Sequence, residues 1–310
     1  MLHQTPAHIH KGLVNGLSNW GFVVAMILAA ACWGTGTVIS KGVLSYVPPL
    51  TLLVIQLVAS LVFLWSVVAV QGSSVPFRRE TVWLAVIGLL NPGLAYTFSL
   101  LGLSLTTVSM SALIWAAEPI LILGLAWLIL RERLTPSLLA CSVLAVAGVL
   151  LVIGIAPGAG SGGYMVGNVL TLVGVFCCAL YTVLTWRAVA NLDPVLVVAL
   201  QQTVALVWAG LIWPFELTEA TAALAAISLQ TWLWTVASGI IYYALAFWFY
   251  IIGLKKIPAS LAGLFLNLIP IFAVGGAYIF LSERLAAVQW VGAVMILGAV
   301  VTMLRLRLPE

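Results

Sequence analysis

Long apolar stretches, separated by short polar or glycine- and proline-containing segments, follow one another along the whole chain. Each stretch is almost continuously apolar for about 20 residues, the length that an α-helix needs to cross a bilayer, whereas barrel strands would alternate over about ten residues. The pattern therefore predicts an all-α integral membrane protein with ten transmembrane helices. The predicted spans are Trp20–Ser40, Pro49–Val70, Thr81–Leu101, Thr107–Leu130, Pro136–Ile155, Val166–Trp186, Pro194–Trp213, Trp232–Ile252, Ala259–Leu281 and Val288–Leu304.

Composition and charge agree with this pattern. Of the 310 residues 64% are hydrophobic and 6% are charged, far below the roughly 25% of a soluble domain. The lysines and arginines lie at predicted span ends and form no basic patch, so we expect no nucleic-acid partner. A cytoplasmic N-terminus leaves only Lys41 and Arg284 outside, which agrees with the bias of basic residues toward cytoplasmic loops. Both termini are thus predicted to be cytoplasmic, and the protein to lie in an inner (plasma) membrane.

The chain contains an internal repeat. Shifting the sequence by 151 residues superimposes the stretch from Trp83 to Leu134 on the stretch from Trp234 to Leu285 without a gap. The coincident pairs include Trp83/Trp234, Gly88/Gly239, Leu94/Leu245, Phe98/Phe249, Ser109/Ser260, Pro119/Pro270 and Gly124/Gly275, and both copies end in Glu-Arg-Leu. Matched tryptophan, proline and charged residues indicate a duplication rather than chance.

The repeat predicts the domain organisation. Each copy holds an odd number of spans, so the second copy enters the bilayer from the opposite side and the two halves form inverted five-helix repeats. Such repeats are used for alternating access around a site near the membrane midplane, which indicates a transporter. The predicted segments are a cytoplasmic N-terminal segment 1–19, a first repeat 20–155, a second, inverted repeat 166–304 and a cytoplasmic tail 305–310.

Several short motifs carry a family resemblance. They are Trp33-Gly34-Thr35 with Lys41 at the end of the first span, Glu118-Pro119 and Glu132-Arg133-Leu134 in the fourth, and Pro270 followed by Ser282-Glu283-Arg284-Leu285 in the ninth. With the repeat, these motifs resemble the drug/metabolite transporter superfamily, in its ten-span branch with two EamA-type repeats. Among its bacterial members the chain is similar to aromatic amino acid exporters.

The resemblance implies a fold and a class of substrates. Members export amino acids, metabolites or drugs, and the first, third, fourth, sixth, eighth and ninth spans surround a central cavity, with the fifth and tenth peripheral. The sixth span departs from the pattern of the first, because Cys178-Ala179-Leu180-Tyr181 stands where Cys32-Trp33-Gly34-Thr35 would map. The two sides of the expected cavity are therefore chemically different.

Glu118 is the carboxylate predicted near the bilayer centre. An ionisable group at that depth is costly and is by default a functional candidate, here as a proton-coupling group or as a counter-charge for a substrate amine. The alternative is a neutral carboxylic acid that bonds to a neighbouring helix. The shift of 151 maps Glu118 to Ile269, two residues from Asn267. Two residues turn a helix by about 200°, so strict symmetry would not let Glu118 and Asn267 both face the cavity.

Other polar and aromatic residues predicted at mid-depth complete the candidate site. Trp33 and Thr37 share one helix face, as do Trp115 and Glu118, and a face that mixes rings with polar groups suits a cavity that binds an amino acid. For any one of these residues, packing between helices is the alternative. The predicted substrate-binding residues are Trp33, Thr37, Asn91, Tyr96, Trp115, Glu118, Tyr181, Tyr242 and Asn267, and the predicted hinges are Pro119 and Pro270.

The same residues narrow the class of protein and the class of substrate. We expect a secondary exporter of amino acids, including aromatic ones, or of related small metabolites. Efflux of drugs or lipophilic cations through the same cavity is the alternative. No buried lysine or arginine is predicted to meet a phosphorylated substrate. No cluster of acidic, histidine or cysteine residues suggests an enzyme, a metal or a cofactor, and no GxxxxGK[ST] loop suggests an ATP-driven pump. The expected partners are a small-molecule substrate and the lipid bilayer, with the chain a monomer or weak dimer.

Overall fold

The computed structural model describes residues 7–72, 78–130, 162–185, 193–254, 265–266 and 268–307, with isolated positions between 136 and 151. All regular secondary structure within these residues is helical. The first half contains α1 (Ala7–Val43), α2 (Pro49–Gln71), α3 (Arg79–Ile87), η1 (Leu89–Leu94), α4 (Ala95–Leu105), α5 (Val108–Trp115) and α6 (Glu118–Leu130). The second half contains α8 (Gly162–Thr185), α9 (Pro194–Ile212), η2 (Trp213–Glu216), α10 (Leu217–Ala226), α11 (Leu229–Ser238), η3 (Gly239–Leu245), α12 (Ala246–Leu254), α14 (Ile269–Phe280) and α15 (Ala287–Arg307).

Apolar helices of membrane-spanning length dominate the described residues. Six helical stretches are long and apolar enough to cross a bilayer: Gly21–Val43, Pro49–Gln71, Arg79–Leu105, Gly163–Leu184, Pro194–Ala226 and Leu229–Gly253. Three shorter apolar helices fall within the predicted fourth, ninth and tenth spans. The all-α membrane fold is confirmed, whereas the count of ten spans and the side of the termini stay predictions. Most of the predicted fifth span lies outside the described residues.

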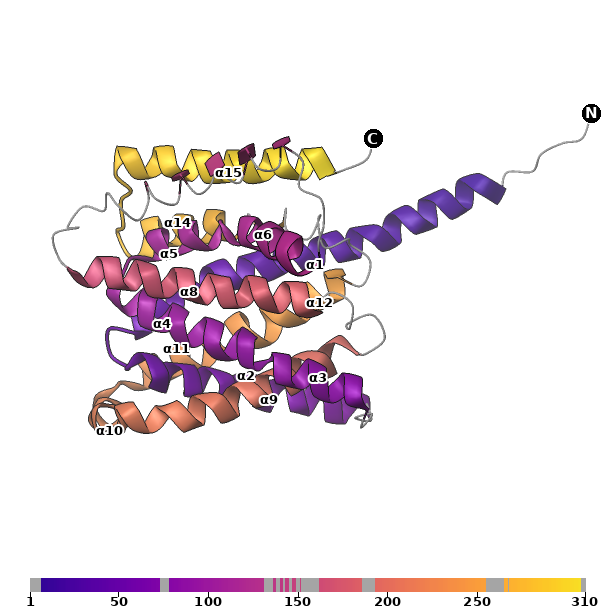
Figure 1. The fold of residues 1–310 in the computed structure, drawn as a ribbon. Coiled ribbons are helices and arrows are strands. Elements are labelled where there is room, and N and C mark those ends of the chain that lie inside the picture. Colours follow the sequence, from indigo (N-terminus) through magenta and orange to yellow (C-terminus); the bar gives the residue numbers. More distant parts are fainter. Residues whose placement is uncertain are drawn as a thin grey trace, which may run out of the picture.

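The two halves of the chain are interleaved. In the first half, α1 packs against α12 and α14 of the second half, and α2 packs against η3; in return, α8 packs against α4 and α6, and α9 packs against η1. Each of these contacts has its counterpart when the halves are exchanged, and α2 against α9 joins equivalent helices directly. This exchange is the pattern that a two-fold relation between the repeats produces. Figure 1 shows α15 in an outer layer, beyond α14, α5 and α6.

The predicted third and eighth spans both contain π-helical segments, at equivalent positions. η1 follows Gly88 and η3 begins at Gly239, and within η1 the backbone of Asn91 leaves the helical region, with φ −146° and ψ 117°. A Cβ atom at Gly88 would overlap the backbone of Gln201, and one at Gly239 would overlap the backbone of Gln56. Glycine therefore lets each span approach its partner closely where the helix changes its winding. π-Segments of this kind are frequent at functional sites.

The predicted fourth and ninth spans are interrupted just before their prolines. α5 ends at Trp115 and α6 begins at Glu118, so Pro119 is the second residue of the new helix; Pro270 is likewise the second residue of α14. A proline inside a continuous helix would remove a backbone hydrogen bond. Instead both lie in a first turn, where the amide has no intrahelical partner and proline is favoured. In the fourth span two turn residues, Ala116 and Ala117, separate α5 from α6 ahead of the proline.

Polar side chains join the helices at the centre of the bundle. Gln56 Nε2 donates to Ser40 Oγ at 2.9 Å and to Ser238 Oγ at 2.7 Å, and Gln202 Nε2 donates to the carbonyl oxygen of Tyr243 at 2.9 Å. These bonds pair the buried amide nitrogens of both glutamines in an apolar bundle, where an unpaired polar group is costly. The glutamines of the second and seventh spans therefore connect helices.

Candidate functional site

A cavity lies between the two halves of the bundle. The volume of the cavity is about 60 Å³, enough for several water molecules. Residues of both halves line it, from α1, η1, α4, α5, α6, α8, η3, α12 and α14. The lining residues are Trp33, Thr37, Asn91, Tyr96, Ser111, Ala112, Trp115, Ala116, Glu118, Pro119, Cys178, Tyr181, Thr182, Tyr242, Phe247, Tyr250, Leu266, Ile269 and Pro270.

The structure brings nearly all of the predicted site residues to this cavity. Trp33, Thr37, Asn91, Tyr96, Trp115, Glu118, Tyr181 and Tyr242 line it together with both predicted hinges. Asn267 lies outside the described residues, but its near neighbour Ile269, the counterpart of Glu118, lines the cavity. The positions agree with the prediction; the binding and hinge roles stay predictions.

Sequence reasoning missed several lining residues, and the repeat contained the signal for three of them. A shift of 151 residues carries Tyr96 to Phe247, Trp115 to Leu266 and Glu118 to Ile269. The residues of the first half were recognised because they are polar or carry a large ring. Their apolar counterparts in the second half resembled ordinary core residues. Cys178 was noted only as a departure from symmetry. Nothing in the pattern singled out Tyr250.

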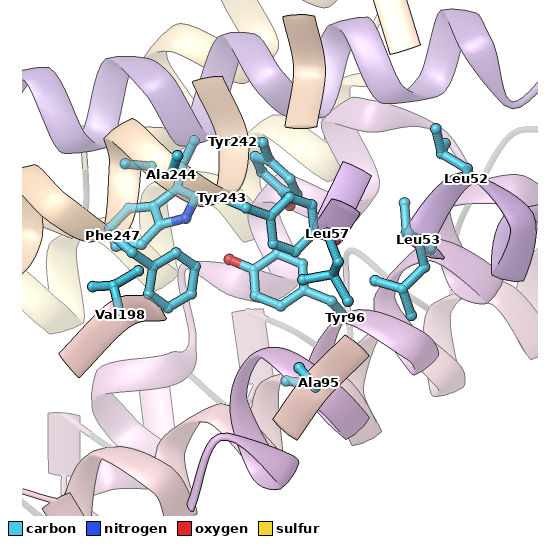
Figure 2. Packing of buried hydrophobic residues seen from close by; sticks show 14 of the residues in the cluster. Leu52, Leu53, Leu57, Ala95, Tyr96, Val198, Tyr242, Tyr243, Ala244 and Phe247 are labelled. Atoms are coloured by element: carbon cyan, nitrogen blue, oxygen red, sulfur yellow. The ribbon is translucent and has the colours of Figure 1, made fainter. Parts of the chain in front are cut away.

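One wall of the cavity is aromatic. The ring centroid of Trp33 lies 5.2 Å from that of Phe247 and 5.3 Å from that of Tyr250, in edge-to-face arrangements. Tyr96 lies 5.2 Å from Tyr242, again edge to face, a geometry that the ring quadrupoles favour. Figure 2 shows Tyr96, Tyr242 and Phe247 gathered in one cluster. These contacts hold the rings in a fixed arrangement around the space.

Polar atoms are held in place on the same lining. Trp115 Nε1 donates to Ser99 Oγ at 3.1 Å and Tyr181 donates its hydroxyl proton to Gln201 Oε1 at 3.0 Å, so residues behind the lining orient both side chains. The Oγ1 atom of Thr37 lies 3.4 Å from the hydroxyl of Tyr242. This contact joins α1 to η3 across the cavity.

Charge on the lining is confined to one residue. Glu118, which is 7% exposed, is the only acidic side chain among the described lining residues, and these include no lysine, arginine or histidine. Among the described residues no group of three or more histidine, cysteine or acidic side chains is placed to hold a metal ion. The site therefore offers hydrogen bonds, aromatic faces and one carboxyl group to a small solute.

A polar network joins the helices on one side of the cavity, beyond the lining residues. Lys41, one turn past Thr37 on α1, donates to the carbonyl oxygens of Leu103 at 2.7 Å and Thr106 at 2.6 Å. The carboxylate of Glu283, after the end of α14, accepts from the amides of Val108 and Ser109, both at 2.9 Å. A helix N-terminus and a carboxylate attract each other, and the network links α1, α4, α5 and the segment after α14.

These features define a class of protein: a multi-pass integral membrane protein with a solute-sized cavity between two interleaved repeats. The sequence profile of the EamA-like transporter family matches the chain twice, over residues 20–154 and 165–305. The chain belongs to this family. It is a membrane transporter of the drug/metabolite transporter superfamily rather than an enzyme.

Similar proteins agree with this assignment. The uncharacterized transporter YetK of Bacillus subtilis is 25% identical over 296 residues, covering 94% of this chain and 89% of the relative. The uncharacterized transporter YvbV of the same organism is 26% identical over 284 residues, covering 89% and 90%. A protein of known crystal structure is 20% identical with a TM-score of 0.63, covering 91% of this chain and 95% of that chain, which shows a shared fold.

Proposed function

We propose that the chain is a secondary transporter that exports amino acids, including aromatic ones, or related small metabolites by alternating access. The observation that carries the proposal is the cavity between the repeats, in which Trp33, Tyr96 and Phe247 offer rings to a side chain and Glu118 offers a carboxyl group to an amine. A mostly apolar site with a few placed polar groups is typical of small-molecule binding.

The size and charge of the cavity support a small zwitterion over the other classes. A cavity of about 60 Å³ suits a small metabolite better than a large drug, because drug-sized ligands occupy pockets of about 300–1,000 Å³. A phosphorylated substrate would require lysine or arginine to pair with its phosphate, and neither is found in the part of the lining that the structure describes. The second candidate, efflux of lipophilic cations, is favoured by Glu118, the single carboxyl group among aromatic rings.

Alternating access requires a seal that opens and closes on each side of the site. We assign the network of Lys41 and Glu283 to the seal on the predicted extracellular side, where both residues fall when the termini are cytoplasmic. Its bonds end on backbone groups of a neighbouring segment, Leu103 to Ser109, so a movement of that segment breaks all of them together. The energy then comes from a gradient, with Glu118 as the candidate proton-coupling group.

The proposal is tested by transport into proteoliposomes that contain the full chain. A labelled panel of aromatic, aliphatic, acidic and basic amino acids and one lipophilic cation is followed with and without a proton gradient. Saturable transport of amino acids is the expected result. Movement of the cation alone would replace the proposal by the second candidate, and no movement of any compound would contradict both.

A further inference from the structure

Three side chains on the cavity lining form a hydrogen-bonded chain. Asn91, in η1, donates from Nδ2 to the Sγ atom of Cys178, in α8, at 3.2 Å. The thiol of Cys178 is in turn hydrogen-bonded to Glu118, the first residue of α6. A thiol has one proton; because its sulfur accepts from Asn91, that proton is directed at the carboxyl group of Glu118. Cys178 thus fixes the orientation of an amide on one side and of a carboxyl group on the other.

The chain ends in an acceptor that has no partner. Asn91 is 3% exposed, and its Oδ1 atom makes no hydrogen bond within the described structure. Buried polar atoms are almost always paired, so an unpaired one requires an explanation. The bond from Nδ2 to Cys178 fixes the plane of the amide and hence the direction of Oδ1. Two lining residues on either side of one sulfur atom therefore carry acceptors: the Glu118 carboxyl group and the Oδ1 atom of Asn91, which is covered and unpaired in this arrangement.

The surroundings of these two acceptors favour a cation. Aromatic rings of Trp33, Tyr96 and Tyr250 line the same cavity, and no basic side chain is among the lining residues. Ring faces and a carboxylate attract any ammonium group. The unpaired amide oxygen restricts the cation further, because only an ammonium group that carries N–H protons can donate a hydrogen bond to it.

We propose that Asn91, Cys178 and Glu118 form a recognition site for a substrate ammonium group that carries N–H protons, and that the site selects against quaternary ammonium. Asn91 and Glu118 accept from the substrate, and Cys178 is a positioning residue that holds both acceptors. A site built to hydrogen-bond a substrate discriminates strongly against an analogue that leaves its polar groups unpaired. The inference rests on the proposed function and narrows its substrate class to primary or secondary amines, including amino acids.

The test compares matched ligands on the purified full chain. The ligands are L-phenylalanine and 2-phenylethylamine, each with its N-trimethyl form. Ligand-dependent thermal stabilisation measures binding without requiring transport, and competition against a labelled transported substrate measures selectivity. In the wild type we expect at least one primary amine to bind. Its affinity should exceed that of its trimethyl form by tenfold or more.

Variants assign that preference to the three residues. Asn91→Leu keeps the side-chain volume and removes the acceptor. The ratio of the affinities for the primary amine and its trimethyl form should therefore fall to near one, while the trimethyl ligand still binds. Cys178→Ala should weaken the preference and Cys178→Ser, which retains a donor and an acceptor, should restore it. Cys177→Ala is the matched control, since Cys177 does not line the cavity, and it should leave the preference unchanged.

The outcomes separate this inference from the proposed function. Equal binding of primary and trimethyl ligands overturns the inference, as does a preference that persists in Asn91→Leu and Cys178→Ala; amino acid transport would still support the proposed function. Failure of both primary amines to bind also overturns the inference. Selective binding of primary amines without transport would instead contradict the proposed function and leave the recognition site supported.

Discussion

The two halves of the chain place equivalent positions on the cavity but give them different chemistry. At the shift of 151 residues, five pairs within the described residues have both members on the lining. They are Asn91/Tyr242, Tyr96/Phe247, Trp115/Leu266, Glu118/Ile269 and Pro119/Pro270. The first half contributes an amide and a carboxyl group, and the second half contributes a ring and an aliphatic side chain at the same places.

The duplicated halves have kept their backbone structure but not their side chains. The backbone has kept its symmetry: both halves have a π-segment at Gly88 or Gly239 and a break before Pro119 or Pro270. The side chains have diverged, so the cavity has a polar side and an apolar side. A solute with an amine at one end and a ring at the other would bind in one orientation, and we expect substitutions to reveal which properties are shared between the halves.

The largest effect is expected at the most asymmetric pair. Glu118→Gln removes the only acidic side chain among the lining residues that the structure describes. A hydrogen bond to a charged group contributes about 1.5–3 kcal/mol, or roughly tenfold to a hundredfold in rate or affinity. Ile269→Val, at the equivalent position, should change transport by less than about threefold. Initial rates in proteoliposomes at several pH values make the comparison. An unchanged rate and pH dependence in Glu118→Gln would remove Glu118 from the mechanism.

A second comparison tests the symmetry of the backbone. Gly88→Ala and Gly239→Ala each force a methyl group against a glutamine backbone, and overpacking of this kind costs about 1–3 kcal/mol. Gly124→Ala and Gly275→Ala are the matched controls, because a Cβ atom at either position meets nothing within 4 Å. Thermal unfolding in detergent should show two destabilised and two unaffected or slightly stabilised proteins. A neutral Gly239→Ala beside a damaging Gly88→Ala would contradict the equivalence.

A third comparison contrasts two carboxylates that bind helix N-termini. Glu283 accepts from the amides of Val108 and Ser109, and Glu216 accepts from the amides of Leu50 and Thr51 at the start of α2, which does not line the cavity. Replacement of either by Gln should cost about 1 kcal/mol.

Only Glu283→Gln should also loosen the proposed seal. We expect it to raise the rate at which a membrane-impermeant thiol reagent labels Cys178 by several-fold, in a chain whose other cysteines are alanine. Glu216→Gln should lower thermal stability without changing the labelling rate. Equal labelling of both variants would argue that the network of Lys41 and Glu283 does not control access to the cavity.

The smallest effect is expected at the matched prolines. Pro119 and Pro270 lie in first turns, where no backbone hydrogen bond is lost, so replacement by alanine should cost less than about 1 kcal/mol, chiefly through the unfolded state. A hinge role would appear as a changed transport rate in a protein of nearly unchanged thermal stability. Unchanged rates in both variants would leave the prolines a structural role only.

The predicted site shows which cavity residues can be identified from the sequence alone. Glu118, Asn91 and Trp33 were found because a polar residue or a tryptophan deep in an apolar span is conspicuous. Tyr96, Tyr181 and Tyr242 were found for the same reason, whereas Tyr250 was missed. Phe247, Leu266 and Ile269 were missed because apolar residues in a membrane span carry no such signal. The π-segments were also missed, since hydrophobic periodicity over one short segment does not distinguish π from α winding.

The sequence by itself determined the membrane class, the positions of most spans, the duplication and the family. These follow from the length and apolarity of segments and from residue identities at a fixed spacing, which are local properties of the chain. Only the tertiary structure decided that Asn91, Cys178 and Glu118 meet, that Lys41 and Glu283 bind one neighbouring segment, and that Gln56 and Gln201 pack on glycines of the other half. Those contacts join residues far apart in the chain, and the packing of interleaved helices, rather than any local pattern, brings them together.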